Sequence, residues 1–205
     1  MVAVVNPWVA REEPAGGESE VPDAPVVRHE FARVHPQPKS VPRPSGGLPY
    51  SPGPIDGRGG WWWLGCHGGA GVTSLGQAVP GGHDAGRVWP VPRAGHSHPV
   101  VLVARCDYGG LTAVQTAASQ WASGAVPGVD LLGVVLTPYS AERRLPRPLR
   151  DLRRLVSGGV PRTWVLPWVE GWRLGEPPAA RPSRELVALG GELSRLTSST
   201  GSQHV

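Results

Sequence analysis

A continuous apolar run that ends in a glycine-rich turn constrains the fold of this chain more than any other feature. Trp61–Leu64 is followed by the glycine-rich segment Gly65–Gly71 and then by the hydroxyl pair Thr73 and Ser74. An unbroken apolar segment is typical of a strand buried on both faces of a parallel sheet. The region therefore predicts a strand, a glycine turn and the first turn of a helix, which is the layout of a phosphate-binding loop.

The loop lacks the positive charge that such a motif normally carries. In the pattern G-x-x-x-x-G-K-[ST], the lysine reaches the β- and γ-phosphates and the hydroxyl residue binds Mg²⁺. Here Thr73 takes the hydroxyl position and Gly71 precedes the lysine position, but Val72 fills that position and the first glycine falls on Cys66. The backbone pattern is therefore retained without its lysine.

The loop resembles more closely the variant K-G-G-x-G-K-T of the MinD/ParA group of P-loop ATPases. On that pattern His67 takes the place of the first lysine and Val72 that of the second, so both lysines are missing. The resemblance implies a P-loop NTPase type of fold, ATP with Mg²⁺ as the ligand, and a candidate phosphate-binding set of His67, Gly68, Gly69, Ala70, Gly71, Val72, Thr73 and Ser74.

The missing lysines leave weak nucleotide binding open and argue against efficient phosphoryl transfer, so no cofactor is assigned with certainty. Successive backbone N–H groups of the loop can still hold an anion at a helix N-terminus. A cation ~4 Å from a phosphate oxygen is worth roughly 4 kcal/mol at an effective dielectric constant near 20, which corresponds to about three decades of affinity or rate. His67 could replace part of this charge only when protonated. No catalytic residue is assigned.

Further along, predicted strands alternate with predicted helices, which favours a three-layer α/β domain with a mostly parallel sheet. In the triple tryptophan, Trp61 and Trp63 should pack on one helix layer and Trp62 on the other, because side chains of a strand alternate. Strands are predicted at 61–66, 86–91, 99–106, 131–137 and 160–169, and helices at 73–79, 110–123, from Pro146 to about 156, and at 186–196.

Two later segments extend the resemblance to the MinD/ParA group, and two others are missing. Gly133–Thr137 is similar to the G-V-V-x-N strand, whose asparagine helps to bind adenine and is Thr137 here; Val165–Pro167 is similar to the late V-I-P strand. Neither a D-x-D switch strand nor a hydrophobic-D-x-P metal strand is visible between Leu75 and Pro99. We therefore expect a reduced sheet. Asp84 and Asp107 do not follow strands in the expected way.

The composition divides the chain into three parts. Residues 1–58 mix proline, glycine and both charge signs without periodicity and are predicted to be a disordered extension. Residues 59–198 carry the apolar segments and form the predicted domain, and residues 199–205 form a flexible tail. No apolar run approaches the ~20 residues of a membrane span, and the start has no signal-peptide pattern, so we expect a cytoplasmic protein.

An arginine-rich segment offers a second candidate site. Arg147, Arg150, Arg153 and Arg154 follow two prolines that suit a helix start. On a helix, Arg147, Arg150 and Arg154 would share one face, which could bind nucleic acid or an acidic partner. An ordinary solvated helix surface is the favoured interpretation, since such faces are common.

Other chemistry is weakly supported. Trp168 and Trp172 could line a cleft near the last strand, although packing is the favoured role. The leucine stripe at 186–196 could target a membrane but lacks flanking basic residues, so packing in the core is preferred. No C-x-x-C or H-x-x-x-H spacing is present, so we expect no metal site and interpret the remaining cysteines and histidines as buried thiols and loop imidazoles: Cys66, His67, His83, His96, His98 and Cys106.

Three hypotheses of function remain from the sequence. The first is a non-hydrolysing MinD/ParA-like P-loop protein that acts as an interaction or regulatory module. The second is a weak nucleotide-binding ATPase of the partition or positioning type, with Thr73 on Mg²⁺ and a basic group supplied by another chain. The third is a DNA-associated accessory protein that uses the arginine-rich helix. An unidentified protein partner and a homodimer are the expected partners, with nucleic acid less supported.

Overall fold

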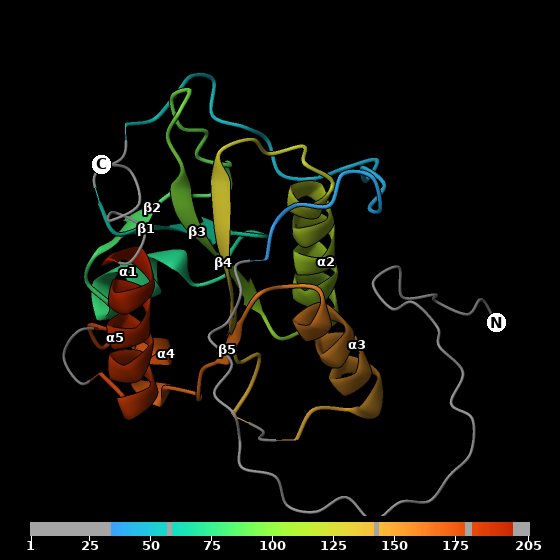
Figure 1. Ribbon diagram of the computed structural model, residues 1–205. Coiled ribbons are helices and arrows are strands. Elements are labelled where there is room, and N and C mark those ends of the chain that lie inside the picture. Colours follow the sequence, from blue (N-terminus) through green and yellow to red (C-terminus); the bar gives the residue numbers. More distant parts are fainter. Residues whose placement is uncertain (1–33, 57–58, 142–143, 179–181, 199–205) are drawn as a thin grey trace, which may run out of the picture.

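The computed structural model describes residues 34–56, 59–141, 144–178 and 182–198. Its centre is a five-stranded sheet with the strand order β2-β1-β3-β4-β5 (Figure 1). Every neighbouring pair of strands is parallel, so the sheet is fully rather than mostly parallel. The strands are β1 (Trp61–Gly65), β2 (Gly82–Asp84), β3 (His98–Arg105), β4 (Val129–Thr137) and β5 (Thr163–Val165).

Helices cover both faces of the sheet, which confirms the predicted three-layer α/β architecture. Helices α2 and α3 lie on one side of the sheet, and α1, α4 and α5 lie on the other (Figure 1). Parallel neighbouring strands need crossover connections, which α1, α2 and α3 supply here. The helices are α1 (Val72–Ala78), α2 (Tyr108–Ala122), α3 (Arg147–Gly158), α4 (Glu170–Arg173) and α5 (Arg184–Ser198).

The triple tryptophan divides between the two core layers as its alternation predicts. Trp61 and Trp63 pack with α1 and α5, their rings edge to face with centroids 5.5 Å apart, whereas Trp62 packs on the α2 side. Leu186, Leu189 and Leu193 of α5 are buried against the Trp61 and Trp63 layer. Burying each large apolar side chain contributes about 1.5–3 kcal/mol, so α5 is a core helix, as predicted.

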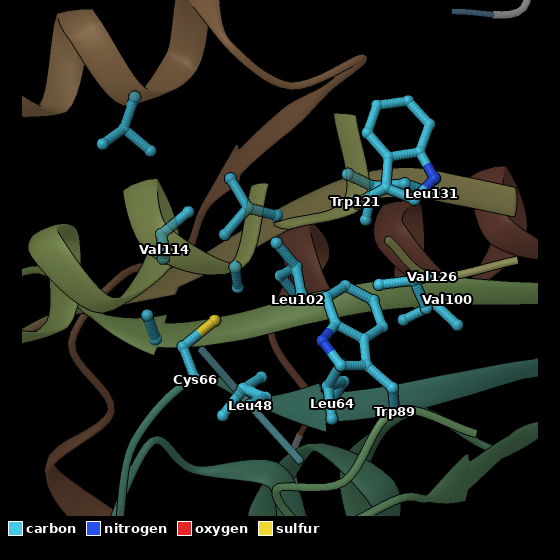
Figure 2. Close-up of a cluster of buried hydrophobic side chains, with 14 of the residues drawn as sticks. Leu48, Leu64, Cys66, Trp89, Val100, Leu102, Val114, Trp121, Val126 and Leu131 are labelled. Atoms are coloured by element: carbon cyan, nitrogen blue, oxygen red, sulfur yellow. The ribbon is translucent and has the colours of Figure 1, made fainter. Parts of the chain in front are cut away.

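Residues 34–56 correct part of the predicted disordered extension. Val41 and Leu48 are buried in the core, and Figure 2 shows Leu48 among side chains of β1, β3 and α2. The carboxamide of Gln120, on α2, accepts hydrogen bonds from the Leu48 amide and from the Trp89 indole, both at 2.9 Å, and donates to the Leu48 carbonyl and to the Tyr50 hydroxyl. This segment is therefore part of the domain. Residues 1–33 and the predicted tail, 199–205, lie outside the described residues.

Two strand predictions were wrong in position or length. The second strand along the chain, β2, lies at Gly82–Asp84, whereas a strand was predicted at 86–91. The last strand, β5, covers only Thr163–Val165 of the predicted 160–169. A side chain at Gly82 would collide with the indole nitrogens of Trp61 and Trp63. The pairing of β2 with β1 therefore depends on a glycine, which sequence patterns do not associate with strands.

None of the helices in the described part of the chain is both long and apolar enough to cross a membrane.

Candidate functional site

The glycine-rich loop lies at the edge of the sheet where the parallel strands end. β1 pairs with β2 on one side and with β3 on the other. The sheet therefore extends from β1 first to β2 and then, in the opposite direction, to β3, β4 and β5. In open α/β sheets, ligands bind outside the carboxyl ends of the strands at such a reversal of strand order. The loop that follows β1 therefore occupies the expected ligand position of this fold.

Glycines and a threonine of β4 fix the shape of the loop. Gly69 has φ = 71° and Gly71 has φ = 101°, a region that costs other residues roughly 1–2 kcal/mol. A Cβ at Gly71 would lie 3.3 Å from the Thr137 methyl group, so loop and strand are in close contact. The Thr137 hydroxyl donates to the carbonyl of buried Ala70 at 3.1 Å. Thr137 thus anchors the loop to the end of β4.

His67 braces the loop and is not free to contact a phosphate. Its Nε2 accepts the backbone N–H of Arg105 at 2.9 Å, and its Nδ1 lies 2.8 Å from the carbonyl oxygen of Gly68. These contacts suit a neutral ring that donates from Nδ1. In this arrangement the imidazole joins the loop to the end of β3 instead of supplying a cation at the first lysine position.

The second lysine position has become part of the core. Val72 is 9% exposed and packs in the same cluster as Leu75 and Trp63. Thr73 is exposed and Ser74 is partly buried, so both hydroxyl residues remain at the surface of the loop. Helix α1, which begins at Val72, has only seven residues, so we assign the site to the loop and the cavities beside it.

Two hollows flank the loop, and every residue of the candidate phosphate-binding set lines at least one of them. The first has a volume of about 300 Å³ and lies between the loop, the ends of β3 and β4, and the segment from Leu166 to Arg173. The second, of about 410 Å³, is open and lies toward β2. Both hollows are lined by Gly69, Ala70, Gly71 and Ser74, and the second alone is lined by His67, Gly68, Val72 and Thr73.

The first hollow combines aromatic side chains with arginines. Tyr139, Trp168 and Trp172 line it together with Arg105 and Arg173, and no carboxylate of the described residues does so. Arg173 is paired with Glu170, which also accepts the Trp168 indole N–H at 2.6 Å. Hydrogen bonds from Arg173, and then from Trp168, lower the pKa of Glu170. The tryptophans thus line a cleft, which the sequence offered only as the less favoured role.

Sequence reasoning missed the position of Asp84. This carboxylate ends β2, beside Trp63 of β1, and lines the second hollow together with Thr73 and Arg87. Its Oδ1 accepts the backbone N–H of Gly86 at 2.6 Å. The signal was weak because β2 has three residues, Gly82, His83 and Asp84, and none of them is apolar.

The arginine-rich segment forms α3 with a proline in its first turn, as predicted. Arg147, Arg150 and Arg154 are exposed, and we call these three residues the α3 arginine face. Arg153 is instead partly buried, and it lies close enough to Cys106 to lower the pKa of that thiol. Arg147 lies 3.8 Å from Asp151 in an exposed ion pair, which contributes little stability.

The cysteines and the histidines lie in separate surroundings and contact different groups. Cys66 and Cys106 are free and buried, and burial raises the pKa of Cys66 to about 12. Burial also raises the pKa of Cys106, with Arg153 acting in the opposite direction. His83 contacts the carbonyl of Gly59 and His98 that of Ile55. Within the described residues, no group of three or more His, Cys, Asp or Glu side chains is arranged to hold a metal ion.

The fold and this edge define a class: a three-layer α/β protein whose glycine-rich loop lies at the switch point of a parallel sheet. Within that class, the chain belongs to the family of unknown function DUF6668, whose sequence pattern matches residues 60–188. The comparisons with curated proteins and with solved structures found no match. The matched region begins directly before β1 and includes both hollows.

Proposed function

We propose that this protein is a non-hydrolysing, MinD/ParA-like P-loop module that binds a nucleotide weakly and acts through a protein partner. The observation that carries the proposal is the first hollow, which runs from the glycine loop to the segment from Leu166 to Arg173. Its volume of about 300 Å³ is at the lower end for small-molecule sites. Phosphates would lie against the loop and a base against the aromatic side chains.

Aromatic rings and an anion-compatible lining support a nucleotide over an uncharged ligand. Trp168 and Trp172 line the hollow, and stacking of a planar base on an aromatic side chain is worth about 1–3 kcal/mol. Arg105 beside the loop, together with the absence of a lining carboxylate among the described residues, favours negative charge at the other end. Thr137, which stands at the base-binding position of the resembling family, also lines this hollow.

The loop residues support binding without hydrolysis. Val72 is buried where the lysine that contacts the γ-phosphate would be, and both nitrogens of His67 have backbone partners. Catalysis of phosphoryl transfer depends on positive charge that stabilises the transferring group. Without a lysine at either position, ATP and ADP should bind with similar affinities, because neither loop residue can contact the γ-phosphate with a positive charge.

Calorimetric titration with Mg-ATP and Mg-ADP, together with a phosphate-release assay, tests this function. We expect weak, similar binding of both nucleotides and no release of phosphate above background. Thr73→Ala should change the affinity little in the absence of Mg²⁺ and weaken Mg-ATP binding in its presence. Turnover that Thr73→Ala abolishes would favour the ATPase alternative, and the absence of any nucleotide binding would refute the proposed ligand.

Nucleic-acid binding remains a second candidate because the α3 arginine face is exposed. Its three guanidinium groups lie on one side of α3, while Leu149, Leu152 and Val156 pack toward the core. Such a face can neutralise backbone phosphates without reading sequence. The face carries the three arginines expected to share it, whereas Arg153, the fourth arginine of the predicted patch, is partly buried.

A further inference from the structure

Arg105 occupies a position that none of the loop motifs includes. It is the last residue of β3, and its side chain lines the first hollow beside the glycine loop. Its Nη2 donates to the carbonyl oxygen of Gly69 at 2.8 Å, and its backbone N–H donates to His67. Main chain and side chain of Arg105 are thus both held against the loop, so its guanidinium has a defined place.

The charge of Arg105 is not neutralised within the described residues. No carboxylate of the described part of the chain forms an ion pair with it, whereas Arg173, the other arginine of this hollow, is paired with Glu170. A guanidinium has five N–H donors, and the bond to Gly69 uses one of them. The remaining donors are available to a ligand in the hollow.

We propose that Arg105 binds the phosphate groups of the ligand and supplies, from the end of β3, the positive charge that the loop no longer carries. This inference rests on the proposed function and adds the residue that recognises the ligand's charge. The planar guanidinium contacts phosphate oxygens through two parallel hydrogen bonds. A neighbouring strand thereby replaces the lysine of the helix start, next to the loop amides that contact the same oxygens.

The experiment compares four chains by calorimetric titration with Mg-ATP, Mg-ADP, adenosine and inorganic pyrophosphate: wild type, Arg105→Gln, Arg105→Lys and the control Arg195→Gln. Arg195 is exposed on α5, and it lies nine residues, or roughly 13 Å of helix, beyond Leu186 at the cavity wall. Circular dichroism and thermal unfolding establish that each variant is folded.

We expect Arg105→Gln to weaken ATP, ADP and pyrophosphate binding by about tenfold or more and to leave adenosine binding within about twofold of wild type. The phosphate affinities of Arg105→Lys should lie between those of wild type and Arg105→Gln, because lysine keeps the charge but not the paired donors. The control should match wild type for every ligand.

The outcomes separate this inference from the proposed function. If nucleotides bind and Arg105→Gln leaves their affinities unchanged, the role of Arg105 is overturned and the nucleotide site stands. If nucleotides fail to bind but pyrophosphate binds in an Arg105-dependent way, the role of Arg105 is supported and the nucleotide is not the ligand. If wild type binds neither nucleotides nor pyrophosphate, both proposals are overturned.

Discussion

Replacing Gln120 with leucine tests whether residues 34–56 are an integral part of the domain. Gln120 is 5% exposed, and its carboxamide forms hydrogen bonds with the Leu48 amide and carbonyl, the Trp89 indole and the Tyr50 hydroxyl. Leucine has a similar size but neither donates nor accepts a hydrogen bond. The change therefore removes the partner of three buried groups: the N–H and C=O of Leu48 and the indole N–H of Trp89.

The expected loss of stability follows from those three groups. Leaving a buried donor or acceptor unsatisfied costs about 1–3 kcal/mol each, and the apolar side chain of leucine offsets part of the sum. We expect Gln120→Leu to lower the free energy of unfolding by about 3 kcal/mol. For a domain of this size, that corresponds to a fall in melting temperature of roughly 6–12 °C.

Urea unfolding followed by tryptophan fluorescence measures this loss, and a double-mutant cycle locates it. Trp89→Phe removes the indole donor, so it should cost less in the Gln120→Leu background than in wild type, with a coupling of about 1 kcal/mol. A Gln120→Leu protein within about 1 kcal/mol of wild type, or a cycle with no coupling, would refute the account of how the segment is held.

Three further predictions concern the loop, the buried thiol and α3. Gly71→Ala should destabilise the protein by about 1–2 kcal/mol, because Gly71 has a positive φ. The control Gly68→Ala should cost less than about 0.5 kcal/mol, as for most surface changes, because nothing lies within 4 Å of the added Cβ. Equal losses of stability in chemical unfolding would contradict the loop geometry. The raised pKa of Cys66, about 12 against an ordinary 9.0, means that the folded state keeps its proton to a higher pH than the unfolded chain. Its contribution to stability is complete below pH 9 and is lost as the pH rises toward 12, so wild type should lose more stability than Cys66→Ala between about pH 9 and pH 11, and parallel curves would count against a buried neutral thiol. Substituting the α3 arginine face with glutamine should reduce the salt dependence of duplex DNA binding by a slope of about 0.9 for each phosphate that is no longer neutralised, and a wild type without salt-sensitive binding would dismiss the DNA hypothesis.

The parts of the fold that the sequence predicted are those with a strong local pattern. β1, β3 and β4 each contain a continuous apolar run, and the alternation of the three tryptophans follows directly from the geometry of a strand. α2 and α5 carry apolar residues at helical spacing.

The missed features depend on contacts between distant residues. Val41 and Leu48 are isolated apolar residues among prolines and glycines, so no periodicity marks their segment, and Gln120 is an ordinary polar residue in a helical pattern. The burial of the Leu48 segment follows from hydrogen bonds that join residues 72 positions apart in the sequence.

The candidate site likewise has a part that the sequence predicted and a part that it did not. The glycine loop was predicted because its residues are consecutive in the sequence, and Gly69 and Gly71 adopt the positive φ that favours glycine. Arg105 was not predicted as a site residue, since only the pairing of β3 with β1 brings it to the loop. Asp84 was set aside because its strand is too short to carry an apolar pattern.

The most direct test of the central claim is a nitrogen–proton NMR titration of the isotopically labelled protein with Mg-ATP. We predict saturable shifts of the backbone amides of Gly68–Ser74 and of the indole signals of Trp168 and Trp172, with the amides of α3 unchanged. Shifts confined to other parts of the chain, or a spectrum unaffected at millimolar nucleotide, would contradict a ligand site at the glycine loop.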